Sequence, residues 1–91
     1  MAAGMYGADL GQLQALAQAF QREWNEVVRL KQTITQQISP DRTAWAGPGA
    51  DKFRGAWEGE FGPALEKLRA ALEEAETAVR QYRDNIERAT A

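Results

Sequence analysis

Two long runs of apolar residues with helical spacing, separated by a short stretch rich in proline and glycine, constrain the fold of this chain most strongly. The first run alternates steps of three and four residues from Leu10 onward, with Lys31 as its interruption. Such spacing predicts an amphipathic helix packed along its whole length, as in a coiled coil. We place this helix at about residues 9–39, because Asp9 is suited to cap its start and Pro40 cannot continue it. Its apolar positions are Leu10, Leu13, Ala17, Phe20, Trp24, Val27, Ile34 and Ile38.

The second run is most regular in its C-terminal half, where steps of four and three continue to the end of the chain. Upstream, Phe53, Trp57 and Phe61 follow one another in two steps of four, which departs from heptad spacing. We therefore expect a kink near residues 59–63, where Pro63 lacks the amide hydrogen that a helix needs. The regular apolar positions are Phe61, Leu65, Leu68, Leu72, Ala75, Val79, Tyr82, Ile86 and Ala89.

The segment between the two runs contains two prolines and two glycines. This composition predicts a turn over about residues 40–48, followed by a second helix over about residues 49–89, and Pro48 is well suited to the first helical position. A chain of 91 residues is expected to form a single domain. The predicted fold is therefore all-α, an antiparallel helix-turn-helix hairpin over residues 1–91.

Such a hairpin carries more apolar side chains than two touching helices can bury. The chain has three Trp, three Phe and two Tyr, and each aromatic side chain buries roughly 150–250 Å² when covered. In a single hairpin we expect water to reach Leu16, Val28, Leu30, Phe53, Trp57 and Ala64. The excess predicts that two hairpins dimerise into a four-helix bundle. The residues expected in the hairpin and dimer interfaces are Leu13, Phe20, Trp24, Val27, Phe53, Trp57, Phe61, Leu65, Leu68 and Leu72.

The chain contains no cysteine and no histidine, which removes most catalytic and metal-binding chemistry. The commonest general base, the thiolate nucleophile and the usual zinc ligands are all missing. Acidic neighbours such as Glu73 and Glu74 are expected on exposed helical faces, where nothing would separate their pKa values. The sequence therefore predicts a protein that is not an enzyme and that takes no metal and no cofactor.

Charge and hydropathy argue against nucleic acid and stable membrane insertion. Eleven basic residues against thirteen acidic ones leave a net charge of -2, whereas nucleic-acid-binding domains carry a basic excess. No stretch approaches the ~18 consecutive apolar residues of a membrane span, and the first ten residues do not resemble a secretory signal peptide. A membrane-active pair of amphipathic helices is an alternative function, which the lack of Lys and Arg enrichment on the polar faces disfavours.

Trp45-Ala46-Gly47 lies between the two helical runs in a chain of about one hundred residues, and this whole arrangement resembles the WXG (Trp-X-Gly) family, the ESAT-like substrates of type VII (ESX) secretion. Physical reasons for the motif can be given separately. The indole of Trp45 can cover the open end of a bundle, and Gly47 allows a chain reversal that a side chain would obstruct.

The resemblance implies a small secreted interaction protein that folds in the cytoplasm and leaves the cell folded, without a cleaved signal peptide. It also implies a four-helix bundle with a related WXG protein (a heterodimer) or with a second copy (a homodimer), and a type VII secretion ATPase as a transient partner. The Gln-rich polar face of the first helix favours a distinct partner. The Ala-, Arg- and Glu-rich composition suggests an actinobacterial source.

One feature departs from the family's pattern, in which an export element places an acidic residue four positions after a tyrosine. Here Tyr82 is followed four residues later by Ile86, and Glu87 is one position too far. Residues four apart share a helical face and residues five apart do not. Tyr82 is therefore a degenerate export motif, and packing roles for Tyr82 and Ile86 are the simpler interpretation. We expect the export signal on the partner chain or beyond Ala91, and the partner is the favoured alternative.

Overall fold

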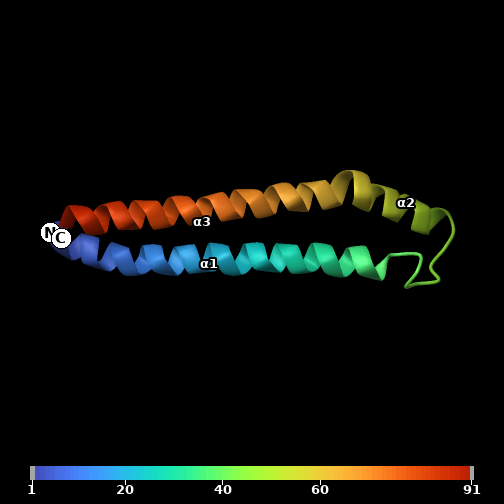
Figure 1. The fold of residues 1–91 in the computed structure, drawn as a ribbon, viewed down its shortest axis with the longest axis horizontal. Helices are drawn as coiled ribbons and strands as arrows, with labels where there is room; N and C mark the ends of the chain where they lie inside the picture. The colour runs from blue at the N-terminus through green and yellow to red at the C-terminus, as the bar shows by residue number, and fades with distance from the viewer. Residues whose placement is uncertain (1, 91) are drawn as a thin grey trace.

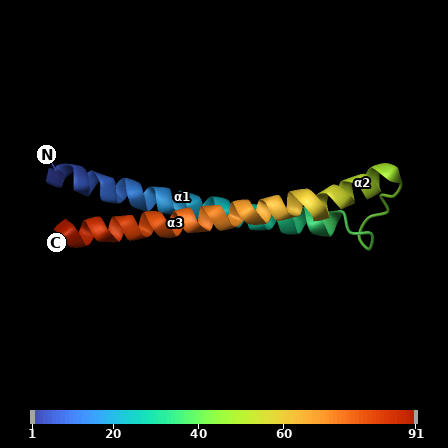
Figure 2. The same cartoon turned by 90° about the horizontal axis from the view of Figure 1, so that it is seen from above.

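The computed structural model describes residues 2–90 and the surroundings of the side chains at residues 10–89. Every regular element in this range is helical: α1 (Ala2–Gln37), α2 (Pro48–Ala56), the π-helical segment η1 (Trp57–Phe61) and α3 (Gly62–Thr90). α1 and α3 run antiparallel and side by side, and the loop between α1 and α2 closes one end (Figure 1). The two long helices twist slightly about each other (Figure 2). The predicted all-α hairpin is confirmed.

The first helix begins earlier than the sequence indicated. α1 starts at Ala2, so the predicted start near residue 9 and the N-cap at Asp9 are wrong. Residues 2–8 include alanine and methionine, which favour helix, and contain no proline. The apolar seam therefore starts inside the helix and does not mark its first turn. The side-chain contacts of Asp9 lie outside the described residues.

The irregularity expected near residues 59–63 takes the form of the π-helical segment η1. Its closing hydrogen bond runs from the Gly62 N–H to the Trp57 carbonyl, five residues back. Pro63 follows directly; it cannot donate a hydrogen bond, and in an α-helix its ring would clash with the carbonyl of Gly59. One extra residue in the turn accommodates the proline without ending the helix. It also shifts the faces of α2 relative to those of α3.

The hairpin is long and thin and encloses little core. It measures 64 × 18 × 17 Å, and its radius of gyration is 19.8 Å, against about 12 Å for a compact domain of this length. Among the described side chains, the buried apolar residues are Ala17, Ala50 and Trp57. The accessible surface is 6477 Å², whereas a compact monomer of this mass exposes about 5,300 Å². Most apolar side chains of this chain are therefore only partly covered by the chain itself.

The geometry of the π turn predicts opposite changes in stability when Gly59 and Gly62 are each replaced by alanine. A Cβ at Gly62 would lie 2.8 Å from the Trp57 carbonyl oxygen, a backbone atom that cannot move alone, whereas a Cβ at Gly59 meets no atom within 4 Å. We expect Gly62→Ala to lower the free energy of unfolding by about 1–3 kcal/mol. Gly59→Ala should raise it by about 0.5–1 kcal/mol, because alanine loses less backbone entropy on folding. Urea unfolding followed by circular dichroism measures both, and equal shifts in one direction would contradict the role of η1.

Candidate interaction surface

Gly47, the N-cap residue directly before α2, has a backbone conformation that side-chain-bearing residues rarely adopt. Its φ is 107° and its ψ is -177°, in a region of the dihedral map that is essentially restricted to glycine. A Cβ at this position meets no atom within 4 Å, so the expectation of a steric obstruction is corrected: the dihedral angle requires glycine. Pro48 follows as the first residue of α2, and the Asp51 N–H donates to the Gly47 carbonyl at 3.0 Å.

Trp45 lies at the loop end of the hairpin against Phe53. Their ring centroids are 6.0 Å apart, and Phe53 in turn stacks on Trp57 at 6.1 Å, within the range of favourable aromatic pairs. Trp45 nevertheless remains 46% exposed. We expected the indole of Trp45 to cover the open end of a bundle. A single hairpin of two helices has no such enclosed end, so Trp45 does not have this role within the single chain. It forms an exposed aromatic edge together with Phe53.

Arg54 ties the loop to the end of α1. Its Nε donates to the Ile38 carbonyl at 2.6 Å, and its Nη2 donates to the Trp45 carbonyl at 2.8 Å. The guanidinium carbon also lies 5.8 Å from the centre of the Trp45 ring, close enough for a cation–π interaction. Carbonyls at the end of a helix need partners of this kind. The sequence did not reveal this role, because backbone carbonyls leave no side-chain pattern.

Two tryptophans link α1 to the second half of the hairpin. Trp57 Nε1 donates to Thr35 Oγ1 at 2.9 Å, and Trp24 Nε1 donates to Glu76 Oε1 at 2.7 Å. Arg80 Nε donates to the other Glu76 oxygen at 2.9 Å. Both hydrogen bonds lower the pKa of Glu76 below its ordinary value, and the bond from Trp24 has the larger effect. The expectation that Trp57 faces water is therefore wrong, because the shift of faces at η1 turns it toward α1.

The residues predicted to form interfaces divide between the hairpin seam and the outside. Trp57 is buried, and six others are half-buried: Leu13, Phe20, Trp24, Val27, Leu65 and Leu72. Phe53, Phe61 and Leu68 are exposed. Of the remaining residues expected to face water, Leu16, Leu30 and Ala64 are exposed and Val28 is half-buried. The predicted set therefore combines side chains that hold the hairpin together with side chains that it leaves uncovered.

The exposed apolar side chains of α1 and α3 lie on one face. Leu16 and Leu30 are fourteen residues apart on α1. Leu68 and Tyr82 on α3 and Phe61 at the end of η1 are separated by multiples of seven, so each set follows one side of its helix. A groove lined by Val27, Leu30, Leu68 and Leu72, with the charged residues Glu23, Glu26 and Arg29 also in its lining, joins the two sides. We define the apolar face by these stripes and by the apolar residues that flank each stripe on one of its two sides. Its positions are Leu13, Leu16, Phe20, Glu23, Val27, Leu30, Ile34, Phe61, Ala64, Leu68, Ala71, Ala75, Ala78 and Tyr82.

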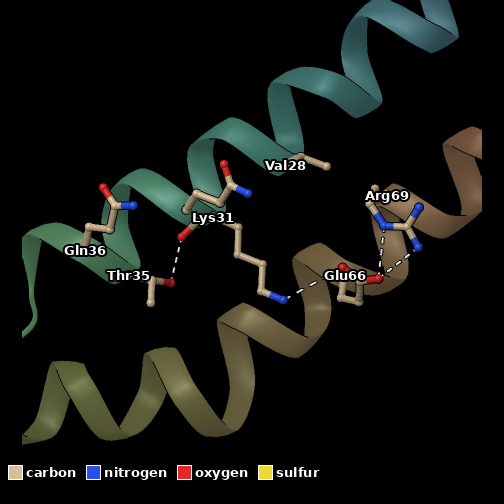
Figure 3. Close-up of a pocket in the computed structure, with 7 residues that line it drawn as sticks. Val28, Lys31, Thr35, Gln36, Glu66 and Arg69 are labelled. Carbon is tan, nitrogen blue, oxygen red and sulfur yellow. Dashed lines mark hydrogen bonds and ion pairs between the residues drawn. The ribbon is translucent and has the colours of Figure 1, made fainter.

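The other side of the hairpin carries a polar groove between α1 and α3 (Figure 3). Lys31 Nζ lies 3.8 Å from Glu66 Oε2, and Arg69 Nη2 lies 2.8 Å from Glu66 Oε1. The hydrogen bond from Arg69 is the main reason why the pKa of Glu66 is lowered. Among the described side chains of residues 10–89, no three acidic groups gather closely enough to hold a metal ion. The charged groups of this groove are paired with one another, which leaves the apolar face as the candidate interaction surface.

Tyr82, the degenerate export residue, belongs to the apolar face. Its side chain is 60% exposed, whereas Ile86 is half-buried. Within the single chain, the packing role expected for both residues therefore fails for Tyr82, because its position on α3 directs it away from α1. Tyr82 is available to a second chain.

Comparison with known proteins gives one match, to a family model. The model described as WXG100, proteins of 100 residues with WXG, matches residues 6–90. No curated protein and no solved structure matches the chain. The match includes the loop motif and both long helices. Within the described part of the chain, no helix has the length and apolar character needed to cross a membrane.

The strained backbone at Gly47 predicts different effects for the two glycines that flank Pro48. Gly47→Ala should lower the free energy of unfolding by about 1–3 kcal/mol, because alanine is forced into a glycine-only conformation. Gly49→Ala lies within α2 with open space around its Cβ and should be neutral or stabilising. Thermal unfolding of the two variants at equal concentration tests this. A Gly47→Ala variant as stable as Gly49→Ala would be inconsistent with the observed dihedral angles.

The lowered pKa of Glu76 predicts that the folded chain loses stability in acid. Because the pKa of Glu76 is lowered from 4.5 in the folded chain, its stabilising effect is complete above the unfolded pKa and disappears as pH falls through the folded pKa. Glu76→Gln should therefore be less stable than the wild type at pH 7, and the difference should vanish in strong acid. Urea unfolding at several pH values between neutrality and strong acid gives this difference directly.

Glu74→Gln is the matched control, because Glu74 is an exposed residue on the same helix. It should follow the wild type at every pH. A Glu76→Gln difference that stays constant with pH would show that the carboxylate charge does not contribute.

Proposed function

Because the chain belongs to the WXG100 family of ESAT-like type VII secretion substrates, we propose that it acts as one subunit of a WXG dimer. Members of this family are small secreted helical proteins. In the proposed assembly, the apolar face packs against a second hairpin of the same family to form a four-helix bundle. The single observation that carries this proposal is the one-sided exposure of Leu16, Leu30, Phe61, Leu68 and Tyr82.

The exposed area supports a permanent partner. The chain exposes 6477 Å², about 1,200 Å² more than a compact monomer of its mass. Obligate interfaces bury roughly 2,000–5,000 Å² in total, about half from each subunit. The excess therefore corresponds to the contribution of one subunit. Monomeric proteins rarely expose continuous apolar patches larger than a few hundred Å², and Leu16, Leu30, Phe61, Leu68 and Tyr82 are all exposed in this chain.

We further propose that the partner carries the export signal. Tyr82 has Ile86 where the family places an acidic residue, and Ile86 is half-buried in the hairpin. One complete signal in a stable complex is enough for both chains to be carried. In this proposal the type VII secretion ATPase engages the complex transiently, and the folded dimer leaves the cell. A homodimer through the same face is the alternative assembly.

Leu68→Glu tests the pairing, because it places a charge in the centre of the apolar face while changing a side chain that is 46% exposed in the hairpin. In cells that naturally produce the protein, we expect the wild type to be recovered as a 1:1 complex with another small helical chain and to reach the medium. Leu68→Glu should be recovered alone, with export lowered at least tenfold, as follows from the cost of covering an unpaired carboxylate. Native mass spectrometry and immunoblots of the medium give both results.

Thr77→Glu is the control, since it adds the same charge at an exposed position of α3 outside the apolar face. It should behave like the wild type, and circular dichroism should show equal helix content for both variants. Recovery of the wild type as a monomer, or full export of Leu68→Glu, would refute the proposed pairing.

A further inference from the structure

Glu23 interrupts the apolar face at its middle. It is seven residues from both Leu16 and Leu30, so it follows the same stripe of α1. It is the one charged residue on the two stripes themselves, whereas Glu26 and Arg29 also line the groove beside it. A leucine at this position would have continued the stripe. The carboxylate of Glu23 is therefore placed where a bound hairpin would cover it.

The chain itself provides little to neutralise this carboxylate. Glu23 Oε1 lies 3.7 Å from Arg22 Nε, too far for a hydrogen bond, and both side chains are more than 60% exposed. Glu26, at the edge of the groove, differs clearly: its Oε2 lies 2.7 Å from Arg29 Nη2. Arg29 is thus engaged by Glu26. Glu23 keeps its hydrogen-bonding capacity for a group outside the chain.

We infer that Glu23 selects the partner, and this inference rests on the proposed pairing through the apolar face. The second hairpin is a different chain that places a lysine or arginine against Glu23. A carboxylate covered by apolar side chains without a cation is strongly destabilising, whereas a cation with good geometry offsets much of that cost. Discrimination between partners arises from this difference.

A second copy of this chain does not place a lysine or arginine against Glu23. Two copies that pack through their apolar faces present the same stripes to each other, and apart from Glu23 these stripes contain no charged residue. Each Glu23 would then face uncharged side chains or the Glu23 of the other copy. Lys67 precedes Leu68 by one residue and so lies to the side of the α3 stripe. Self-pairing therefore brings no new cation onto the stripes to meet Glu23, which disfavours the homodimer. The nearby Arg22 and Arg29 lie beside the stripe and already contact Glu23 and Glu26 of their own chain.

Replacing the charge by leucine in the free chain tests this inference. Sedimentation equilibrium of the purified protein at about 50 μM should show mainly monomer for the wild type, and Glu23→Leu should form a homodimer with a Kd at least about tenfold lower. Glu74→Leu, which makes the same chemical change at an exposed position outside the apolar face, should sediment like the wild type. A wild type that dimerises as tightly as Glu23→Leu would overturn the inference.

The native complex provides the second measurement. Glu23→Lys should weaken association with the natural partner at least about tenfold, since two cations then meet, and Glu74→Lys should not. An unchanged complex with Glu23→Lys would overturn the role of Glu23. The proposed pairing is tested separately by Leu68→Glu: if Leu68→Glu separates the complex and Glu23→Lys does not, the pairing is supported and the selection by Glu23 is rejected.

Discussion

Two helices that lie side by side can cover only the strip along which they touch, and the other features of this protein follow from that constraint. Its buried apolar residues in the described range are two alanines and one tryptophan, while large aliphatic and aromatic side chains remain at the surface. Small domains already bury a modest share of their surface. This chain adds an elongated shape to its small size, so its apolar side chains are fully covered only in an assembly.

Polar contacts compensate for the small core by fixing how the helices are aligned. The indole N–H groups of Trp24 and Trp57 bond to Glu76 and Thr35 across the seam, and Arg54 bonds to the carbonyls of Ile38 and Trp45 at the loop. Heptad seams tolerate shifts by one repeat, whereas these bonds form only in one register. A fixed register in turn keeps the stripes of α1 and α3 at matching heights. The apolar face thus depends on polar groups on the inside of the hairpin.

Much of this arrangement could be predicted from the sequence, because it depends on spacing. The steps of three and four predicted both helices, and the cluster around Pro40 and Pro48 predicted the loop. The altered step near Pro63 predicted the position of η1. The true start of α1 could not be found, because residues 2–8, with three alanines, two glycines, a methionine and a tyrosine, show no apolar seam. The burial of Trp57 depends on the extra residue of the π turn, which rotates one face against another. Arg54 was missed because its partners are backbone carbonyls.

Members of the WXG100 family are small secreted helical proteins, and the role proposed for this chain, pairing through one apolar face, needs no reactive group. The distribution of apolar area over one face is the central claim, and hydroxyl-radical footprinting read by mass spectrometry measures it most directly. Comparison of the purified chain with the complex from its native cells should show strong protection of Leu16, Leu30, Phe61 and Leu68 in the complex, with Thr77 and Gln32 unchanged. Equal labelling of these apolar side chains in both states would contradict the account.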